Sequence, residues 1–181
     1  MEYVHPIKDT KQIRIIKKLL KGKSTRDYLL FVFGINTGLR ISEILPLKYE
    51  DILNEDREVI SYLSVNGENI FINDQIKKAV NFHIRNYTDF SPSDYLFESK
   101  RGTNSVTRQH AYRTIHDAAR KVGINEKIGT HTLRKTFGYH AYTKGIALSL
   151  IQKRFHQSSP SETLRYIGID NTQKQKIDVN L

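Results

Sequence analysis

The chain contains no cysteine among its 181 residues, and no hydrophobic run long enough to cross a membrane. Without cysteine it can form neither a disulfide nor a thiolate metal site, and a reducing compartment is the natural expectation. The longest apolar run, residues 28–35, falls far short of a membrane span, and residues 1–9 have no signal-peptide pattern. We therefore expect a soluble, cytoplasmic protein with no membrane partner.

Acidic residues are the minority: 19 Asp and Glu stand against 29 Lys and Arg, which gives a formal net charge of +10. The charge is segregated, since residues 100–135 carry nine basic and two acidic residues, whereas residues 43–58 carry six acidic and two basic ones. A basic composition is also compatible with an ordinary solvated surface. Segregation favours a basic face turned toward a polyanion such as nucleic acid.

The length suits one domain, residues 1–181, and no interior linker, repeat or low-complexity tract divides it. Apolar spacing and glycine stops predict seven helices and a last short helix that contains Tyr166. Asn66-Gly67, between runs of β-formers, predicts a hairpin or three-stranded sheet over residues 58–73. The fold class is therefore α+β, mostly α-helical with a small antiparallel β-hairpin or sheet, and polar residues 170–181 are expected to form a mobile C-terminal tail. The predicted helices cover residues 9–22, 27–36, 40–45, 74–87, 107–122, 132–144 and 147–155.

Two arginines lie in settings that suit phosphate chemistry. Arg40 follows the predicted turn at Gly38, and Glu43 at i+3 is expected to fix its guanidinium by a bidentate pair. His131 and Arg134 share one helix face, where a guanidinium fork suits phosphate oxygens and an imidazole can move protons near neutral pH. Taken singly, each is more often a solvated surface group.

Three longer segments, in the same order along the chain, resemble the catalytic domain of the tyrosine recombinases, the phage integrase family. TGLRISEILPLKYEDI (residues 37–52) is similar to the family's first-arginine motif, and GTHTLRKTFGYHAYTKG (residues 129–145) resembles its His-x-x-Arg motif. LIQKRFHQSSPSETLRYIGI (residues 150–169) resembles its terminal segment, which ends in the nucleophilic tyrosine. The resemblance covers roughly residues 5 to 170 and implies the fold of that catalytic domain.

The resemblance implies a DNA strand transferase that acts in the integration or excision of mobile DNA. Tyr166, one of ten tyrosines, would attack the scissile phosphate and retain the 3′ side as a phosphotyrosine. Arg40 and Arg134 would hold the phosphate, and His131 would handle the tyrosine proton or position the phosphate. The arginines supply the positive charge, so we expect no metal and no other cofactor.

Two departures from the family pattern bear on the rate of cleavage. The family usually has a hairpin lysine that protonates the leaving 5′ oxygen, but no lysine occurs between Lys48 and Lys77. A lysine from elsewhere, such as Lys48 or Lys100, could compensate, but no pattern in the sequence supports this. Gln157, preceded by His156, stands where the family commonly has His or Trp. Neighbouring helical positions differ by about 100° of rotation, so His156 cannot replace that side chain unless the backbone shifts. Gln157 can donate a hydrogen bond to phosphate but cannot shuttle a proton, so we expect slow cleavage.

The expected partner is double-stranded DNA at a recombination site, bound by a homo-oligomer that in the family is a tetramer. The tail, residues 170–181, would dock on a neighbouring protomer if it is not disordered. The family's N-terminal core-binding domain has no counterpart in the sequence, as expected either for a fragment or for a small natural recombinase. The basic residues expected on the DNA are Lys100, Arg101, Arg108, Arg113, Arg120 and Lys121.

Two alternatives remain open at this point. The first is a catalytically impaired DNA-binding protein of the same fold, which occupies recombination sites; the missing hairpin lysine and Gln157 favour it, whereas the intact Tyr166 opposes it. The second is an unrelated basic helical regulator that reads DNA through residues 107–122. It leaves the three matched segments unexplained.

Overall fold

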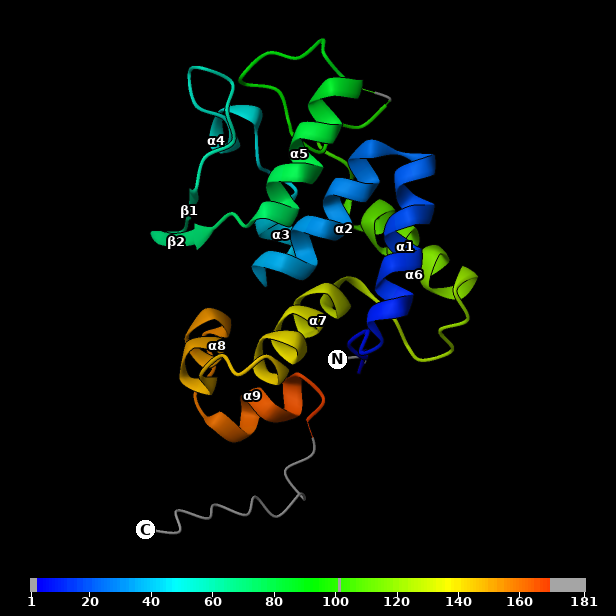
Figure 1. The fold of residues 1–181 in the computed structure, drawn as a ribbon, viewed down its shortest axis with the longest axis vertical. Coiled ribbons are helices and arrows are strands. Elements are labelled where there is room, and N and C mark those ends of the chain that lie inside the picture. The colour runs from blue at the N-terminus through cyan, green and yellow to red at the C-terminus, as the bar shows by residue number, and fades with distance from the viewer. Residues whose placement is uncertain (1–2, 101, 170–181) are drawn as a thin grey trace.

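The computed structural model describes residues 3–100 and 102–169, which contain nine helices and a two-stranded antiparallel sheet (Figure 1). The predicted α+β class, mostly helical with a small hairpin, is confirmed. Arg101 and the tail at residues 170–181 lie outside the described residues. The elements are α1 (Thr10–Lys23), α2 (Thr25–Thr37), α3 (Ile41–Ile44), α4 (Tyr49–Ile52), β1 (Tyr62–Val65), β2 (Glu68–Phe71), α5 (Asp74–Asn86), α6 (Arg108–Lys121), α7 (Thr130–Thr143), α8 (Leu148–Phe155) and α9 (Pro160–Tyr166).

Helix α1 extends past Gly22, the residue at which the sequence predicts its end. Gly22 lies inside α1, and the chain leaves the helix at Ser24, whose backbone is extended. The Ser24 N–H donates to the Leu20 carbonyl oxygen at 2.9 Å, and its hydroxyl accepts from the Asp27 N–H at 3.2 Å. One serine therefore ends α1 and caps α2, because its short polar side chain satisfies the first free amides of the next helix.

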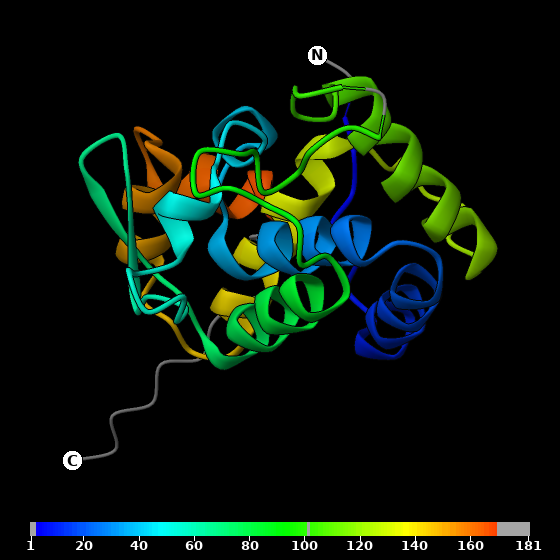
Figure 2. The same ribbon diagram turned by 90° about the horizontal axis from the view of Figure 1, so that it is seen from above.

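Helix α2 is the centre of the larger part of the molecule. It contacts α1, α5, α6 and α7, and Figure 2 shows it enclosed by neighbouring helices. Residues 29–33 are almost completely buried, which explains why this helix is apolar on nearly every side. None of the helices in the described ranges is both long and apolar enough to cross a membrane.

The hairpin forms where Asn66-Gly67 predicted it. Tyr62 pairs with Phe71 and Val65 with Glu68, so that Asn66 and Gly67 make the two-residue turn. Both turn residues have positive φ, 50° and 79°, as a type I′ turn requires. Within the described residues the sheet contains two strands, so the predicted hairpin is observed rather than the predicted three-stranded sheet.

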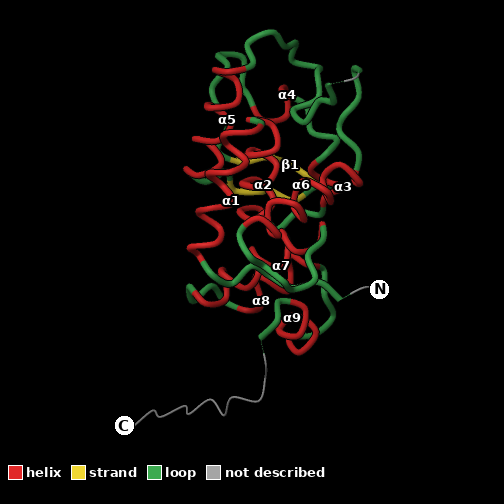
Figure 3. Tube along the Cα trace, turned by 90° about the vertical axis from the view of Figure 1, so that its right-hand side faces the viewer, coloured by secondary structure: helices red, strands yellow, loops and turns green. Residues whose placement is uncertain are grey.

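Helices α7, α8 and α9 form the end of the molecule remote from α4 (Figures 1 and 3). A separate apolar cluster around Phe155 and Ile167 holds α8 and α9 to α7. Gly138 of α7 permits this packing, because a Cβ atom there would lie 2.5 Å from Cγ2 of Ile167 and 2.7 Å from Cε2 of Phe155. The helix that ends in Tyr166 is thus positioned through a close approach that only glycine allows.

Alanine at Gly138 and alanine at Gly22 are expected to change stability in opposite directions. The methyl group of an alanine in place of Gly138 would push Ile167 and Phe155 aside and destabilise the fold by about 1–3 kcal/mol. At Gly22, also inside a helix, nothing lies within 4 Å of the new Cβ, so alanine should stabilise by about 0.5–1 kcal/mol. Urea unfolding midpoints test the pair, and a shift of both variants in the same direction would contradict the packing argument.

Candidate active site

Arg40 lies at the start of α3, immediately after the turn that Gly38 makes. Gly38 has a φ of +70°, and a side chain there would collide with the ring of Phe137. Oε2 of Glu43 accepts the backbone N–H of Arg40 at 2.7 Å, while Oε1 lies 3.5 Å from Nη1 of Arg40. The predicted bidentate pair is therefore wrong, because one carboxylate oxygen is engaged by the backbone. The Arg40 side chain stays 46% exposed and keeps donors for a ligand.

Arg134 of α7 is held almost rigidly inside the protein, with 4% of its surface exposed. Its Nη1 donates to the carbonyl oxygen of Gly38 at 2.6 Å, and its Nη2 donates to that of Arg154 at 3.3 Å. The guanidinium carbon lies 4.5 Å from the ring centre of Phe155. These contacts fix the planar guanidinium before any ligand arrives, which is the condition for strong electrostatic stabilisation.

His131 and Tyr166 meet at the N-terminal end of α7. Nδ1 of His131 lies 3.4 Å from the Tyr166 hydroxyl oxygen. Burial lowers the pKa of His131, and the charges of Arg108, Arg134, Lys135 and Arg40 lower it further. Burial raises the pKa of Tyr166, although Arg134 and Arg40 oppose that shift. At neutral pH the pair is a neutral imidazole beside a protonated phenol, so the imidazole can accept the phenol's proton.

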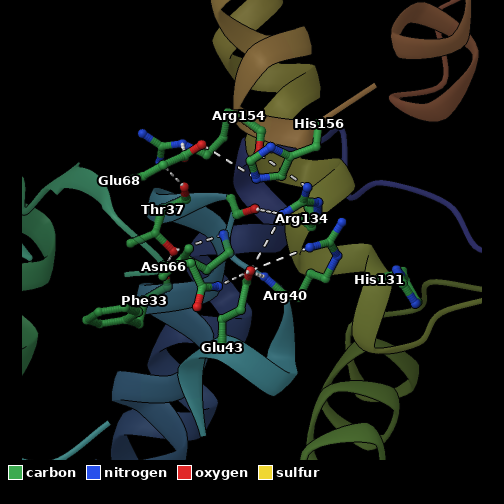
Figure 4. Close-up of polar contacts among 12 residues, drawn as sticks. Phe33, Thr37, Arg40, Glu43, Asn66, Glu68, His131, Arg134, Arg154 and His156 are labelled. Atoms are coloured by element: carbon green, nitrogen blue, oxygen red, sulfur yellow. Dashed lines mark hydrogen bonds and ion pairs between the residues drawn. The ribbon is translucent and has the colours of Figure 1, made fainter. Parts of the chain in front are cut away.

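A cavity of about 90 Å³ lies between the two arginines and His131. Figure 4 shows Arg40 and Arg134 side by side, with His131 to the right of both. The cavity is small and lined by cationic and hydroxyl groups, which suits an anion such as one phosphate group. Its polar lining residues are Arg40, Ser42, Arg108, Thr130, His131 and Arg134. Among the described residues no three His, Asp or Glu side chains lie together as a metal site would require.

Gln157 and His156 lie in different surroundings. Gln157 lines a pocket of about 270 Å³ that also contains Tyr166 and His131, and its buried Oε1 has no hydrogen-bond partner in the described part of the chain. His156 ends α8 with a φ of +52°, and its Nε2 lies 3.5 Å from Oε1 of Glu68 on the hairpin. His156 does not line the pocket that Gln157 shares with Tyr166, so it does not take the place of Gln157.

The basic residues predicted on the DNA do not all lie together. Arg108 and Arg120 line a groove of about 740 Å³ on α6, which Lys127 also lines. Arg108 belongs to the phosphate-sized cavity as well, so the groove leads into it. Arg113 and Lys121 are exposed on α6 but do not line the groove. Lys100 lines a separate pocket around His83, away from the arginines of the site.

Two cationic residues at the site were missed by the sequence analysis. Nζ of Lys135 lies 4.0 Å from the ring centre of Tyr3 and 4.9 Å from that of Tyr166, and burial lowers its pKa. Its spacing of four from His131 was the available signal. Arg154 donates to the Thr37 carbonyl oxygen at 2.7 Å, a contact between distant segments that no local pattern could reveal.

Comparisons with known proteins identify the family of the chain. A family model described as the phage integrase family matches residues 8–173. The chain is 43% identical over 171 residues to a probable integrase/recombinase, YoeC, of Bacillus subtilis, covering 94% of this chain and 92% of that protein. It is 32% identical over 164 residues to the tyrosine recombinase XerA of Pyrococcus furiosus, covering 86% of this chain and 54% of that protein.

Solved structures show the same fold. A crystal structure of XerA recombinase matches 94% of this chain and 61% of that one, with a TM-score of 0.75 and 22% identity. XerH site-specific recombinase, bound to its palindromic difH substrate in a post-cleavage complex, matches 94% of this chain and 51% of that one, with a TM-score of 0.70 and 19% identity. The chain therefore belongs to the phage integrase family and has the fold of the tyrosine recombinase catalytic domain.

Proposed function

We propose that the chain cleaves and rejoins DNA strands through a covalent 3′-phosphotyrosyl intermediate, as a site-specific recombinase of mobile DNA. The observation that carries this proposal is the convergence of four groups from three separate segments. Arg40, His131 and Arg134 line a cavity of about 90 Å³, and the Tyr166 hydroxyl lies 3.4 Å from His131. A nucleophile, a proton acceptor and two guanidinium groups are the parts that transfer of a phosphate diester requires.

In the proposed reaction the Tyr166 oxygen attacks the scissile phosphorus and passes its proton toward Nδ1 of His131. The bond from phosphorus to the 5′ oxygen breaks, and the strand whose 3′ end carries the phosphate stays on the tyrosine as a phosphodiester. Arg40 and Arg134 bind the non-bridging oxygens and stabilise the charge that develops on them. Rejoining runs the same steps with a 5′-hydroxyl as nucleophile, because the phosphotyrosyl bond conserves the bond energy.

The proposed partner is double-stranded DNA, bound by several copies of this chain. The groove lined by Arg108 and Arg120 leads into the phosphate-sized cavity, which supports a backbone path along α6. Arg113 and Lys121 would contact phosphates farther along that helix, and Lys100 would do so only at a separate surface. Arg101, also proposed to contact DNA, lies outside the described residues. Such contacts make DNA affinity fall steeply as salt rises.

The alternative function, an impaired DNA-binding protein of this fold, would follow if the site bound phosphate without cutting. The contact between Tyr166 and His131 speaks against it, because the hydroxyl lies within reach of a proton acceptor. Gln157 still speaks for it, since an amide cannot replace an imidazole in proton transfer.

A nicked duplex that carries a candidate attachment site tests the proposal. The nick lets a short released strand diffuse away, so that even slow cleavage accumulates as a covalent adduct. We expect a denaturation-resistant protein–DNA band that retains a label at the 5′ end of the cleaved strand and loses a label at its 3′ end, with peptide mapping of the attachment to Tyr166. Salt-sensitive binding without any adduct would support the alternative instead.

The acid limb of the pH–rate profile is expected to lie below the ordinary imidazole pKa of about 6.5. Burial lowers the pKa of His131, so the neutral, proton-accepting form persists to lower pH and the rate falls only when the pH drops through that depressed value. Arg108 is the largest of the charges that depress it, so Arg108→Gln should move the limb to higher pH.

Initial rates at DNA concentrations well below saturation report the free enzyme and are the measurement of choice. Arg108→Gln is expected to lower the rate at every pH as well, because it weakens DNA binding. The position of the limb, rather than its height, is therefore the readout. An acid limb that stays at the same pH in Arg108→Gln would show that His131 is not the group whose titration sets the limb.

A further inference from the structure

Breaking the bond to the 5′ oxygen requires a proton for the departing alkoxide, and few groups at the site can supply it. Guanidinium groups such as Arg40 and Arg134 do not lose their protons in proteins. His131 is in contact with the nucleophile and takes the proton that Tyr166 gives up. Gln157 has no proton to give. The ammonium group of Lys135 lies 4.9 Å from the ring centre of Tyr166, on the side of the nucleophile. The donor for the leaving oxygen is therefore expected on the other side of Arg134.

The imidazole of His156 lies on the far side of Arg134, in the lining of a small cavity that Arg134 also lines. Figure 4 shows His131 on one side of Arg134 and His156 on the other, beside the hairpin. In an in-line displacement the leaving oxygen departs opposite the nucleophile. The leaving oxygen would thus face the small cavity next to the hairpin rather than Tyr166. That cavity is lined by Glu43, Asn66, Glu68, Arg134, Arg154 and His156.

Glu68 on β2 holds the imidazole of His156. Oε1 of Glu68 lies 3.5 Å from Nε2 of His156, and Oε2 lies 3.8 Å from Nε of Arg154. Arg154 is in turn tied to the Thr37 carbonyl oxygen at 2.7 Å. The carboxylate is therefore held beside the ring, where it can orient it. Because Nε2 is the nitrogen that approaches Glu68, Nδ1 is the nitrogen left for substrate.

The backbone of His156 supplies a second, independent observation. It is left-handed, with φ 52° and ψ 42°, at the C-terminal end of α8, where glycine is the residue that the conformation prefers. A histidine there strains the chain, and a strained residue beside a ligand site is grounds for a functional hypothesis. Its side chain is 54% exposed, so packing in the core does not explain it.

We propose that His156, oriented by Glu68, donates the proton to the 5′ oxygen that leaves in the cleavage step. The inference rests on the proposed function. As the Tyr166 oxygen bonds to phosphorus, the bond to the 5′ oxygen breaks and that oxygen takes the proton from Nδ1 of His156. The products are the 3′-phosphotyrosine, a free 5′-hydroxyl and a neutral imidazole. In rejoining, the same imidazole removes that proton.

The test compares two nicked duplexes, one ordinary and one with sulfur in place of the bridging 5′ oxygen. A thiolate leaves without protonation, because thiols are far more acidic than alcohols. His156→Asn keeps a residue that tolerates the left-handed backbone but removes the acid. We expect it to slow adduct formation on the ordinary duplex by about 10²–10⁴-fold and to cleave the sulfur duplex at close to the native rate.

His131→Asn is the matched control. It removes an imidazole from the nucleophile's side and is expected to stay slow on both duplexes. Glu68→Gln should slow the ordinary duplex less than His156→Asn does, and sulfur should restore it. His156→Gly should raise the urea unfolding midpoint by relieving the strain, yet share the cleavage defect that sulfur rescues.

Three outcomes overturn the inference. His156→Asn could cleave the ordinary duplex at the native rate, or it could lose the same factor on both duplexes, as a structural role would cause. The native chain could also cleave only the sulfur duplex, which would mean that no residue acts as the acid while the proposed function stands. If the native chain forms no adduct on either duplex, the proposed function itself fails, and this inference fails with it.

Discussion

Replacing Tyr166 with phenylalanine is expected to abolish the covalent protein–DNA adduct while the fold and DNA binding persist. The hydroxyl oxygen, 3.4 Å from His131, is the only atom lost, and the chain then has no nucleophile at that point. The ring stays, so its edge-to-face contact with Phe155, at 5.3 Å between centres, is preserved. Denaturing gels of the nicked duplex measure the adduct, and native gels measure binding.

Tyr139→Phe is the control for this change. Tyr139 belongs to the same C-terminal apolar cluster as Tyr166, and the substitution removes one hydroxyl from it in the same way. We expect the Tyr139 variant to form the adduct at the native rate. An adduct that persists in Tyr166→Phe would mean that another residue attacks the DNA.

Arg134→Ala is expected to slow adduct formation by about 10³–10⁵-fold, the usual worth of an arginine that stabilises transferring phosphoryl charge. The guanidinium is buried and already held by two carbonyl oxygens, so its alignment needs no rearrangement when DNA binds. Removing it also leaves the carbonyl oxygens of Gly38 and Arg154 without a donor, which costs stability by about 1–3 kcal/mol. Single-turnover rates and urea unfolding separate the two losses.

Arg134→Lys keeps the charge but not the planar fork. One ammonium group cannot reach both carbonyl oxygens and a phosphate in the same arrangement, so we expect most of the rate loss to remain. Arg113→Ala provides a matched arginine on the surface of α6, outside the groove, and should change the rate by only a few fold. A lysine variant that cleaves at the native rate would show that charge alone, without alignment, is sufficient.

The sequence predicted most elements because their signals are local. Apolar spacing located the long helices to within about two residues, and Asn66-Gly67 located the hairpin turn. The four-residue helix α4 was not predicted, because one turn contains too few residues to show a periodicity. The end of α1 was misplaced at Gly22, since the cap at Ser24 serves two helices at once.

The sequence motifs predicted which residues belong to the site, but not the contacts that hold those residues in place. Arg40, the His131 and Arg134 pair of α7, and Tyr166 come from three separate segments, and the structure brings them to one place. What holds them was not predictable, because the partners of Arg134 are backbone carbonyl oxygens 96 and 20 residues away, and a carbonyl carries no residue-type signal. Lys100, considered in place of the missing hairpin lysine, lies at a different pocket.

The ring of Phe155 is shared by the two halves of the site. The guanidinium of Arg134 lies 4.5 Å from its centre on one side, and the ring of Tyr166 packs against it edge to face. Because the nucleophile Tyr166 and the phosphate-binding Arg134 contact the same phenylalanine ring, one protomer supplies both of them to the same phosphate. Each protomer should therefore cut in cis the phosphate that it binds, so a chain lacking the Tyr166 hydroxyl and a chain lacking the Arg134 guanidinium cannot complement one another.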